Sequence, residues 1–486
     1  MPTRWLCSLN VLSDLSQPES TSLSPTNMVL PTGLLLVAPF SPYLFNGNPC
    51  VSDNFYGNYR DGEVLYSVIA LSASTSSSCL ADYRWASHMT SAFYNERPEP
   101  GNQLVWLEKN AIDDKLQVNA AHDSAILENL LLSLEAPHTH EHQQHLSPID
   151  HRRPPFKLHF RTTRAALVSL DAERAKSIDT MLPIYWKSTL LPTAPVDYVP
   201  VPRAAVEPVK QLLANLKFDP LVASVVNNIS ISQIKNDIRF LTGEDEKSGI
   251  VSRHSFSEGA LTAAHWLKDR VAETGASCKL VPFLSGFAPN VICGHYDSRG
   301  SFGSVRAPGG DDDGSGTTGV LSIARTIKRK GVKFHSNVEL AFFAGEEQGL
   351  LGSRAYAREL RAAGTNLTLM VQADMTAYRA PGEPLQLGLP DLIGTPEVTQ
   401  LVANISAIYS PELQVGFTPA CCSDHQSFHE QGFPATQVFE RAGPIADPMY
   451  HNSGDLSNRE GYDFEQLYAI AKVQFATILH TAGFEL

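Results

Sequence analysis

The stretch that decides the fold reads Gly309-Gly310-Asp311-Asp312-Asp313-Gly314-Ser315-Gly316, and a second acidic run, Phe342-Phe343-Ala344-Gly345-Glu346-Glu347, follows it. Carboxylates held this close together beside apolar, strand-like sequence repel one another unless a cation lies between them. Before both runs, an apolar segment that begins at Val291 ends in His295, and Asp297 follows two residues later. We therefore expect a metal site in this part of the chain.

Helical and strand-like segments alternate on both sides of this stretch. From apolar spacing, caps and breakers we expect helices over residues 232–243, 257–274, 314–330, 348–363, 396–408, 423–431 and 463–480. Strands are expected over residues 278–283, 289–294, 337–343, 369–373 and 435–440. Such alternation indicates crossover units and a mostly parallel sheet.

The predicted fold class is therefore α/β, with an open, mostly parallel sheet that carries helices on both faces, over residues 206–486. Ligands of such sheets bind outside the carboxyl ends of the strands. His295, Glu346, Glu347 and Asp374 each fall at such an end. The coincidence favours a functional site at this edge of the sheet.

The first part of the chain has a different character. We expect residues 1–155 to form an irregular, low-complexity region with one short helix over 124–134, and residues 156–205 to form a pro-segment or accessory region. A His-rich tract over 137–145 can be interpreted as a metal-capture site or as a polar linker, and its composition favours the linker.

The overall charge limits the classes of partner. The chain has 38 Lys and Arg against 51 Asp and Glu residues, a formal net charge of −13, so we expect no nucleic-acid partner and no anionic membrane surface. It contains no run of 18 or more apolar residues that predicts a membrane span. The apolar stretches 5–12 and 28–45 are interrupted, and neither predicts a signal peptide.

Cysteines and sequons give weak evidence about the compartment. The seven cysteines are too irregularly spaced to predict a disulfide framework, and no CxxC pair indicates a zinc knuckle. Sequons begin at Asn228, Asn366 and Asn404, which is compatible with secretion, although a chain of this length contains some by chance.

The residue types at the expected site suit zinc. The candidate ligands, two imidazoles and three carboxylates, are His295, Asp312, Glu347, Asp374 and His451. If one carboxylate is shared, two ions can lie about 3.5 to 4 Å apart, as in two-metal hydrolases. Glu346 is then left over, and a free carboxylate beside the metals is what a general base requires.

Each of these pieces has a second interpretation when taken alone. Asp311-Asp312-Asp313 and Glu346-Glu347 are also typical of the acidic first turn of a helix. His295 and His451 are also typical of hydrogen-bonded core or surface histidines. The functional interpretation depends on their joint occurrence at successive strand ends.

The order of the motifs resembles a known family. The motifs are His295-Tyr296-Asp297, the stretch 307–316, Glu346-Glu347-Gln348-Gly349-Leu350-Leu351-Gly352-Ser353, Gln372-Ala373-Asp374-Met375-Thr376, Cys422-Ser423-Asp424-His425 and Tyr450-His451. They resemble those of the co-catalytic zinc aminopeptidases, in particular secreted leucine-type enzymes of fungi and bacteria. The resemblance covers residues from about 215 to 486 and implies a phosphorylase/hydrolase-like zinc exopeptidase fold.

The resemblance assigns roles to individual residues. It implies that Asp312 bridges two Zn²⁺ ions, that His295 and Asp374 complete one site, and that Glu347 and His451 complete the other. Glu346 takes the role of general base. It further implies that Asp297 orients His295, and that the Asp312-Asp313 peptide bond is cis.

Residues 418–422 depart from the pattern of the family. Family members commonly have a disulfide near the Ser-Asp-His run, but the partner position here is Thr418, and Cys421 and Cys422 are adjacent. The sequence is compatible with a vicinal disulfide between Cys421 and Cys422 and also with two free thiols. Ala420 stands where the family often has a tyrosine, so a transition-state hydrogen bond from that position is not expected.

We therefore expect a secreted, monomeric dinuclear zinc aminopeptidase that acts on the N-termini of peptides or proteins. The alternatives are a carboxypeptidase or glutaminyl cyclase of the same fold, or a metal-free scaffold protein. For the N-terminal region, an intramolecular chaperone, an inhibitory pro-segment and an accessory domain all stay open.

Overall fold

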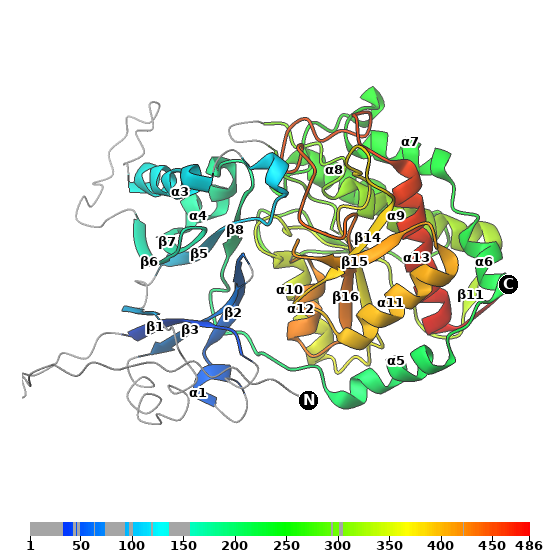
Figure 1. Ribbon diagram of the computed structural model, residues 1–486, viewed down its shortest axis with the longest axis horizontal. Coiled ribbons are helices and arrows are strands. Elements are labelled where there is room, and N and C mark those ends of the chain that lie inside the picture. Colours follow the sequence, from blue (N-terminus) through cyan, green and yellow to red (C-terminus); the bar gives the residue numbers. More distant parts are fainter. Residues whose placement is uncertain are drawn as a thin grey trace, which may run out of the picture.

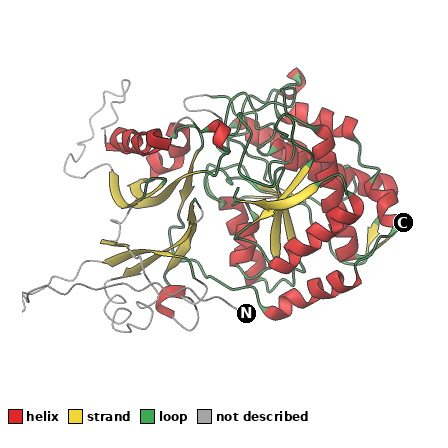
Figure 2. Cartoon of the chain, viewed as in Figure 1, coloured by secondary structure: helices red, strands yellow, loops and turns green. Residues whose placement is uncertain are grey.

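The computed structural model describes residues 33–41, 45, 49–62, 64–72, 93–96, 101–117, 120–135, 156–292, 295–300, 305–420 and 422–486. These residues form a mixed α/β molecule with a strand-rich N-terminal region and a larger region in which helices surround short strands (Figures 1 and 2). We call residues 33–190 the N-terminal region and residues 203–486 the C-terminal region.

The strands of the C-terminal region pair in both directions. β10 (Asn290–Ile292) lies antiparallel to β9 (Lys279–Val281) and to β12 (Ala341–Phe342). Parallel pairs are formed by β13 (Met370–Ala373) with β16 (Ala435–Val438), and by β14 (Gln386–Pro390) with β15 (Gln414–Thr418). The α/β class is confirmed, with parallel pairing at β13 to β16 and antiparallel pairing around β10.

Helices cover both sides of these strands (Figure 1). They are α5 (Arg203–Asn215), α6 (Pro220–Val226), α7 (Ile231–Leu241), α8 (Glu258–Ala272), α9 (Gly314–Lys330), α10 (Leu351–Ala362), α11 (Pro396–Tyr409), α12 (His425–Glu430) and α13 (Phe464–Ala482). The C-terminus ends in β17 (Phe484–Glu485), which pairs with β11 (Lys333–Phe334).

Helix α9 carries the acidic stretch at its start. Its predicted bounds are confirmed, because both ends have strong local signals. The Asp313 side chain accepts a hydrogen bond from the Gly316 amide at the N-cap, and Gly331 ends the helix with φ 68°. Leu321, Ile323 and Ala324 are buried, which fixes the helix against the core.

The N-terminal region contains two four-stranded antiparallel sheets. The first has the order β2-β3-β1-β4, from β1 (Gly33–Pro39), β2 (Phe55–Asp61), β3 (Val64–Ser72) and β4 (Phe93–Glu96). The second has the order β6-β7-β5-β8, from β5 (Asn102–Lys109), β6 (Phe156–Arg161), β7 (Ala165–Asp171) and β8 (Trp186–Leu190). The helices are α1 (Pro49–Ser52), α3 (Ala120–Glu135), which confirms the expected helix, and α4 (Ala172–Ser177).

The sequence analysis expected irregular structure where these strands lie. The second sheet is buried on both faces, with Val105 and Leu107 against α3 and Leu104 and Trp106 against the first sheet. Strands buried on both faces do not show the polar alternation that reveals a half-buried strand. The His-rich tract over 137–145 lies outside the described residues.

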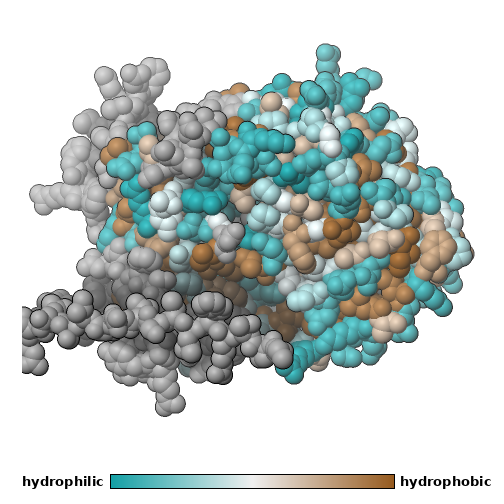
Figure 3. All heavy atoms as spheres, viewed as in Figure 1, coloured by the Kyte–Doolittle hydropathy of each residue, from teal (hydrophilic) through white to brown (hydrophobic). Residues whose placement is uncertain are grey.

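Hydrophilic and hydrophobic residues are interspersed on the face shown in Figure 3. Among the described residues, none of the helices is both long and apolar enough to cross a bilayer.

Candidate metal centre

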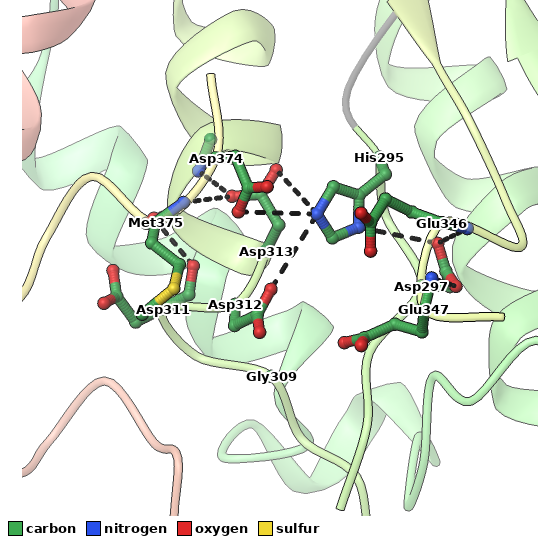
Figure 4. A network of polar contacts seen from close by, with 12 residues as sticks. His295, Asp297, Gly309, Asp311, Asp312, Asp313, Glu346, Glu347, Asp374 and Met375 are labelled. Atoms are coloured by element: carbon green, nitrogen blue, oxygen red, sulfur yellow. Dashed lines mark hydrogen bonds and ion pairs between the residues drawn. The ribbon is translucent and has the colours of Figure 1, made fainter. Parts of the chain in front are cut away.

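The predicted site residues come from the ends of several strands and from two loops. His295 follows β10, Glu346 and Glu347 follow β12, and Asp374 follows β13. Two further groups come from loops, Asp312 from the loop before α9 and His451 from the loop between β16 and α13. The structure brings these six residues together, and Figure 4 shows the side of the cluster around His295.

One group of possible ligands surrounds His295. Its Nε2 atom lies 3.5 Å from Asp374 Oδ1 and 3.8 Å from Asp312 Oδ1. The ring is fully buried, and neither of its nitrogens has a hydrogen-bond partner among the residues that the structure describes. Two ligand atoms about 2.0 to 2.2 Å from one tetrahedral ion lie about 3.3 to 3.6 Å apart. The orphaned ring nitrogen and its 3.5 Å distance from Asp374 therefore fit a zinc ion.

A second group shares one carboxylate with the first. His451 Nε2 lies 2.9 Å from Glu347 Oε2 and 3.2 Å from the second oxygen of Asp312. Asp312 therefore faces one imidazole with each of its two oxygens. This is the geometry of a carboxylate that can bridge two ions.

The loop that carries Asp312 is held by main-chain hydrogen bonds. Asp455 accepts hydrogen bonds from the amides of Asp311 and Asp312, at 3.0 and 3.1 Å. Asp313 accepts hydrogen bonds from the amides of Gly316 and Met375. The Asp312-Asp313 peptide bond is cis, as predicted.

Asp297 lies under His295 and also holds the turn that carries the two glutamates. Its Oδ1 atom is 3.5 Å from His295 Nδ1. The same carboxylate accepts hydrogen bonds from the amides of Glu346 (3.3 Å) and Glu347 (3.4 Å) and from the Ser255 hydroxyl. The arrangement can orient the imidazole and place the glutamates side by side.

The buried carboxylates raise one another's pKa. Burial raises the pKa of Asp312, and the charge of Glu347 raises it further. Burial likewise raises the pKa of Glu347, and Glu346 adds to this shift. Like charges this close cannot all ionise without a cation, so the electrostatics also fit a metal centre.

His451 is held by a residue that the sequence analysis did not single out. Arg299 lies 3.0 Å from His451 Nδ1, and a guanidinium can only donate, so this nitrogen accepts the hydrogen bond. Burial and the charge of Arg299 lower the pKa of His451 to about 4. The ring is therefore neutral near pH 7, as a ligand has to be.

The N-terminal region also reaches the site, which the sequence analysis did not predict. Lys187 on β8 places its Nζ atom 3.6 Å from Glu346 Oε1. The Asn110 side chain donates a 3.0 Å hydrogen bond to the Tyr450 hydroxyl, next to His451. A single lysine within a strand carries no motif, so no sequence signal pointed to it.

The region that departs from the family pattern lies at the edge of the site. Ala420 and Cys422 both line the small cavity beside the carboxylates. Cys422 is disulfide-bonded, as are Cys50 and Cys278, so Cys422 is not a free thiol. Cys421 lies outside the described residues.

Comparisons with known proteins identify relatives of this chain. Residues 288–476 match the model of Peptidase family M28. A probable leucine aminopeptidase of Arthroderma otae is 27% identical over 297 residues, which span 55% of this chain and 77% of that protein. Leucine aminopeptidase 1 of Sclerotinia sclerotiorum is 34% identical over 190 residues, which span 36% of this chain and 48% of that protein.

Among solved structures, the LapA aminopeptidase of Legionella pneumophila has a similar fold. It is 16% identical, with a TM-score of 0.54, and the match covers 80% of this chain and 100% of that chain. A match of this extent is longer than residues 203–486, which we call the peptidase region from here on, so the likeness in fold continues into the N-terminal region.

Proposed function

We propose that this chain, which carries a peptidase domain of family M28, is a metallo-aminopeptidase that removes N-terminal residues from peptides. The observation that carries the proposal is the pair of ligand groups that share Asp312, with Glu346 beside them as an additional buried carboxylate. A peptidase that uses metals needs both parts, ligands and a base.

We assign two zinc ions to the two groups. His295, Asp312 and Asp374 would hold one ion, and Asp312, Glu347 and His451 would hold the other. When bound, the ions would polarise the scissile carbonyl and lower the pKa of the attacking water. The unmet ring nitrogens of His295 and the mutual repulsion of the buried carboxylates support this assignment.

Glu346 is the proposed general base, which transfers a proton from the attacking water to the leaving amine. Its carboxylate does not belong to either ligand group, and burial raises its pKa, whereas Lys187 and His295 counteract part of that shift. A carboxylate with a raised pKa can accept a proton from water near neutral pH. It then delivers that proton to the amine that leaves when the peptide bond breaks.

The shape of the site suits an apolar side chain next to a free amine. Met375, Phe439, Ile445 and Tyr450 form an apolar cluster beside the carboxylates. The acidic residues can bind the ammonium of a substrate. We infer that peptides with a free N-terminus and an apolar first residue are the substrates.

The experiment compares blocked and free substrates. The zinc content of the chain is measured, and the zinc-loaded chain is assayed with leucine amide and N-acetyl-leucine amide, as purified and after limited proteolysis. We expect two zinc ions per chain and at least about 100-fold faster hydrolysis of the free amine. A preference for the blocked amide or for peptide C-termini would contradict the proposal, and conversion of N-terminal glutamine to pyroglutamate would indicate a cyclase.

We further propose that the chain acts outside the cell as a monomer. Three cysteines of the described part are disulfide-bonded, which is typical of proteins from an oxidising compartment. Asn228 and Asn366, which begin sequons, are both exposed. Detection of the glycosylated chain in culture medium, and light scattering that gives the mass of one chain, would test both parts.

A further inference from the structure

Lys187 brings a positive charge to the cavity beside the ligand groups. It lies on β8, opposite Glu108 of β5. Its neighbour Trp186 is buried in the core formed with α3, and because side chains alternate along a strand, Lys187 points the other way, toward the peptidase region. Among the described residues that line the cavity, Lys187 is the only one with a permanent positive charge. Metal binding and proton transfer leave this charge without a role.

The Lys187 ammonium lies next to the proposed general base. Its Nζ atom is 3.6 Å from Glu346 Oε1, and it donates a 3.1 Å hydrogen bond to the carbonyl oxygen of Cys422. An ammonium has three N–H groups, so a further acceptor can bind beside these two. The side chain is 12% exposed, and the cavity that it lines is partly open to solvent. A substrate that reaches the ligand groups can therefore contact the ammonium.

The ammonium stays charged while its partners change. Burial lowers the pKa of Lys187, but the charges of Glu346 and Glu108 outweigh this and raise the pKa overall. When Glu346 accepts a proton from water, it becomes neutral, and the ammonium loses a negative partner. A largely buried charge that loses its partner is costly, so a carboxylate supplied by the substrate would stabilise this stage of the reaction.

The position of Lys187 relative to Glu346 is fixed by the packing of β8 against the turn that follows β12. The Leu190 amide donates a 3.0 Å hydrogen bond to the Gln348 carbonyl. At Gly349, which has φ 118°, an added Cβ atom would lie 2.8 Å from Thr189 Cγ2. The strand that carries the ammonium is therefore in place before a ligand binds, which lowers the entropy cost of binding.

In a dipeptide, a carboxylate lies close to the atom that Glu346 protonates. One carbon atom separates the leaving nitrogen from the carboxylate, so the carboxylate oxygens lie about 2.7 to 3.6 Å from that nitrogen. A glutamic acid that donates its proton to the nitrogen lies about 3 Å from it. Because the Lys187 ammonium is 3.6 Å from the same glutamate, it can reach the carboxylate. In a longer peptide, a neutral amide takes this place.

We propose that Lys187 binds the C-terminal carboxylate of dipeptides and makes the full-length chain selective for them. The inference rests on the proposed function and names its substrate class, which is dipeptides with a free amine, an apolar first residue and a free carboxylate. An amide or a third residue at the C-terminal end removes the charge that pairs with Lys187. The N-terminal region contributes to the site as long as β8 is in place.

The experiment compares substrates that differ only in this charge. The zinc-loaded full-length chain is assayed with leucylglycine and leucylglycinamide, and N-acetyl-leucylglycine tests the need for a free amine. Calorimetry measures binding of the phosphinic analogue of leucylglycine and of the carboxamide of that analogue. The binding readout does not depend on turnover.

Three variants assign the preference to Lys187. Lys187→Met removes the charge and keeps most of the length, Lys187→Arg keeps the charge, and Lys176→Met on α4, where the side chain is solvated, is the matched control. We expect the wild-type chain to prefer the acid over the amide by at least about tenfold in kcat/KM and in affinity. The ratio should fall to about one or below in Lys187→Met, and should persist in Lys187→Arg and Lys176→Met.

Two results would overturn the inference. One is a wild-type chain that treats the acid and the amide alike, a comparison that does not depend on the folding of any variant. The other is a Lys187→Met variant that keeps the full preference for the acid, because the carboxylate would then be bound by another group.

The substrates also distinguish the inference from the proposed function. Selective binding of the acid analogue that depends on Lys187, without hydrolysis of leucylglycine, supports carboxylate recognition and contradicts the aminopeptidase proposal. So does faster hydrolysis of N-acetyl-leucylglycine than of leucylglycine. Hydrolysis of leucylglycine and leucylglycinamide at equal rates supports the aminopeptidase and contradicts recognition by Lys187.

Discussion

The peptidase region and the N-terminal region meet at the same site with opposite charge. The peptidase region contributes buried carboxylates, among them Asp312, Glu346, Glu347 and Asp374. The N-terminal region contributes the ammonium of Lys187, which pairs with Glu346 at 3.6 Å. A cluster of buried acids therefore has two kinds of partner in this molecule, the metal ions proposed for it and a cation of the same chain.

The two regions also differ in how their contribution is positioned. The acids of the peptidase region are held by main-chain amides, such as those that donate to Asp297 and Asp455. Lys187 is held by the register of a strand and by the fit of β8 to Gly349. The two ligand groups are therefore expected to keep their arrangement when Lys187 is removed.

The largest expected effect comes from removing the shared ligand. Asp312→Ala takes one oxygen ligand from both groups at once, so we expect zinc content to fall from two ions to fewer than one per chain and hydrolysis to fall to background. Zinc determination on the purified variant measures this directly. Retention of two ions would show that Asp312 is not the bridge.

Removal of the proposed base should affect turnover but not metal content. Glu346→Gln keeps the shape of the side chain but cannot accept a proton, and we expect kcat to fall by about 10² to 10⁴-fold. The control is Glu359→Gln on the exposed side of α10. If the variant keeps both its zinc and most of its turnover, the assignment of the base is wrong. The same variant also removes the charged partner of Lys187.

Substitution of Asp455 tests whether its hydrogen bonds to main-chain amides hold the acidic stretch 309–316 in place. Asp455→Asn replaces an acceptor of the Asp311 and Asp312 amides and of Arg459 by a group with one acceptor fewer. We expect the free energy of unfolding to fall by about 2 to 3 kcal/mol, because buried hydrogen bonds to a charged group are lost. Denaturant titration measures this, with exposed Glu460→Gln as the control. A loss within the error of the control would mean that the loop does not depend on Asp455.

The smallest expected effect concerns the ion pair between Asp179 of the N-terminal region and His254 of the peptidase region. Burial lowers the pKa of His254, but Asp179 outweighs this and raises it overall. Burial raises the pKa of Asp179, but His254 and Arg299 outweigh this and lower it overall. The pair therefore stabilises the fold most between about pH 4 and 6.5. Its contribution fades as the pH rises through the raised pKa of His254, and as the pH falls through the lowered pKa of Asp179.

A double-mutant cycle of His254→Gln and Asp179→Asn measures the coupling. We expect about 1 to 2 kcal/mol at pH 5.5 and close to zero at pH 9. The exposed Lys176–Glu173 pair, with both side chains largely solvated, is the control and should show little coupling at either pH. Coupling that grows toward pH 9 would contradict the assignment of charges.

The sequence was most informative where local signals and chemistry coincide. Helix α9 could be predicted to the residue because Asp313 caps it and Gly331 ends it. The seven predicted site residues lie close together because strand ends of an α/β fold meet at one edge. Their roles stay a prediction, but their proximity follows from the order of the elements.

The rest depends on tertiary contacts that leave no local pattern. The strands of the N-terminal region are buried on both faces and lack alternation. β14 and β15 were missed because each is a short strand with a central glycine, Gly388 and Gly416, which approach the backbone or side chain of residues 441 and 442. Lys187 lies beside Glu346 only because β8 packs against the Glu346-Glu347 turn, and this packing leaves no pattern in the sequence.

Anomalous scattering at the zinc absorption edge, from a crystal of the full-length chain grown with zinc, tests the dinuclear centre most directly. We expect two peaks, one between His295, Asp312 and Asp374 and one between Asp312, Glu347 and His451. A single peak that Asp312 does not contact would contradict the dinuclear centre.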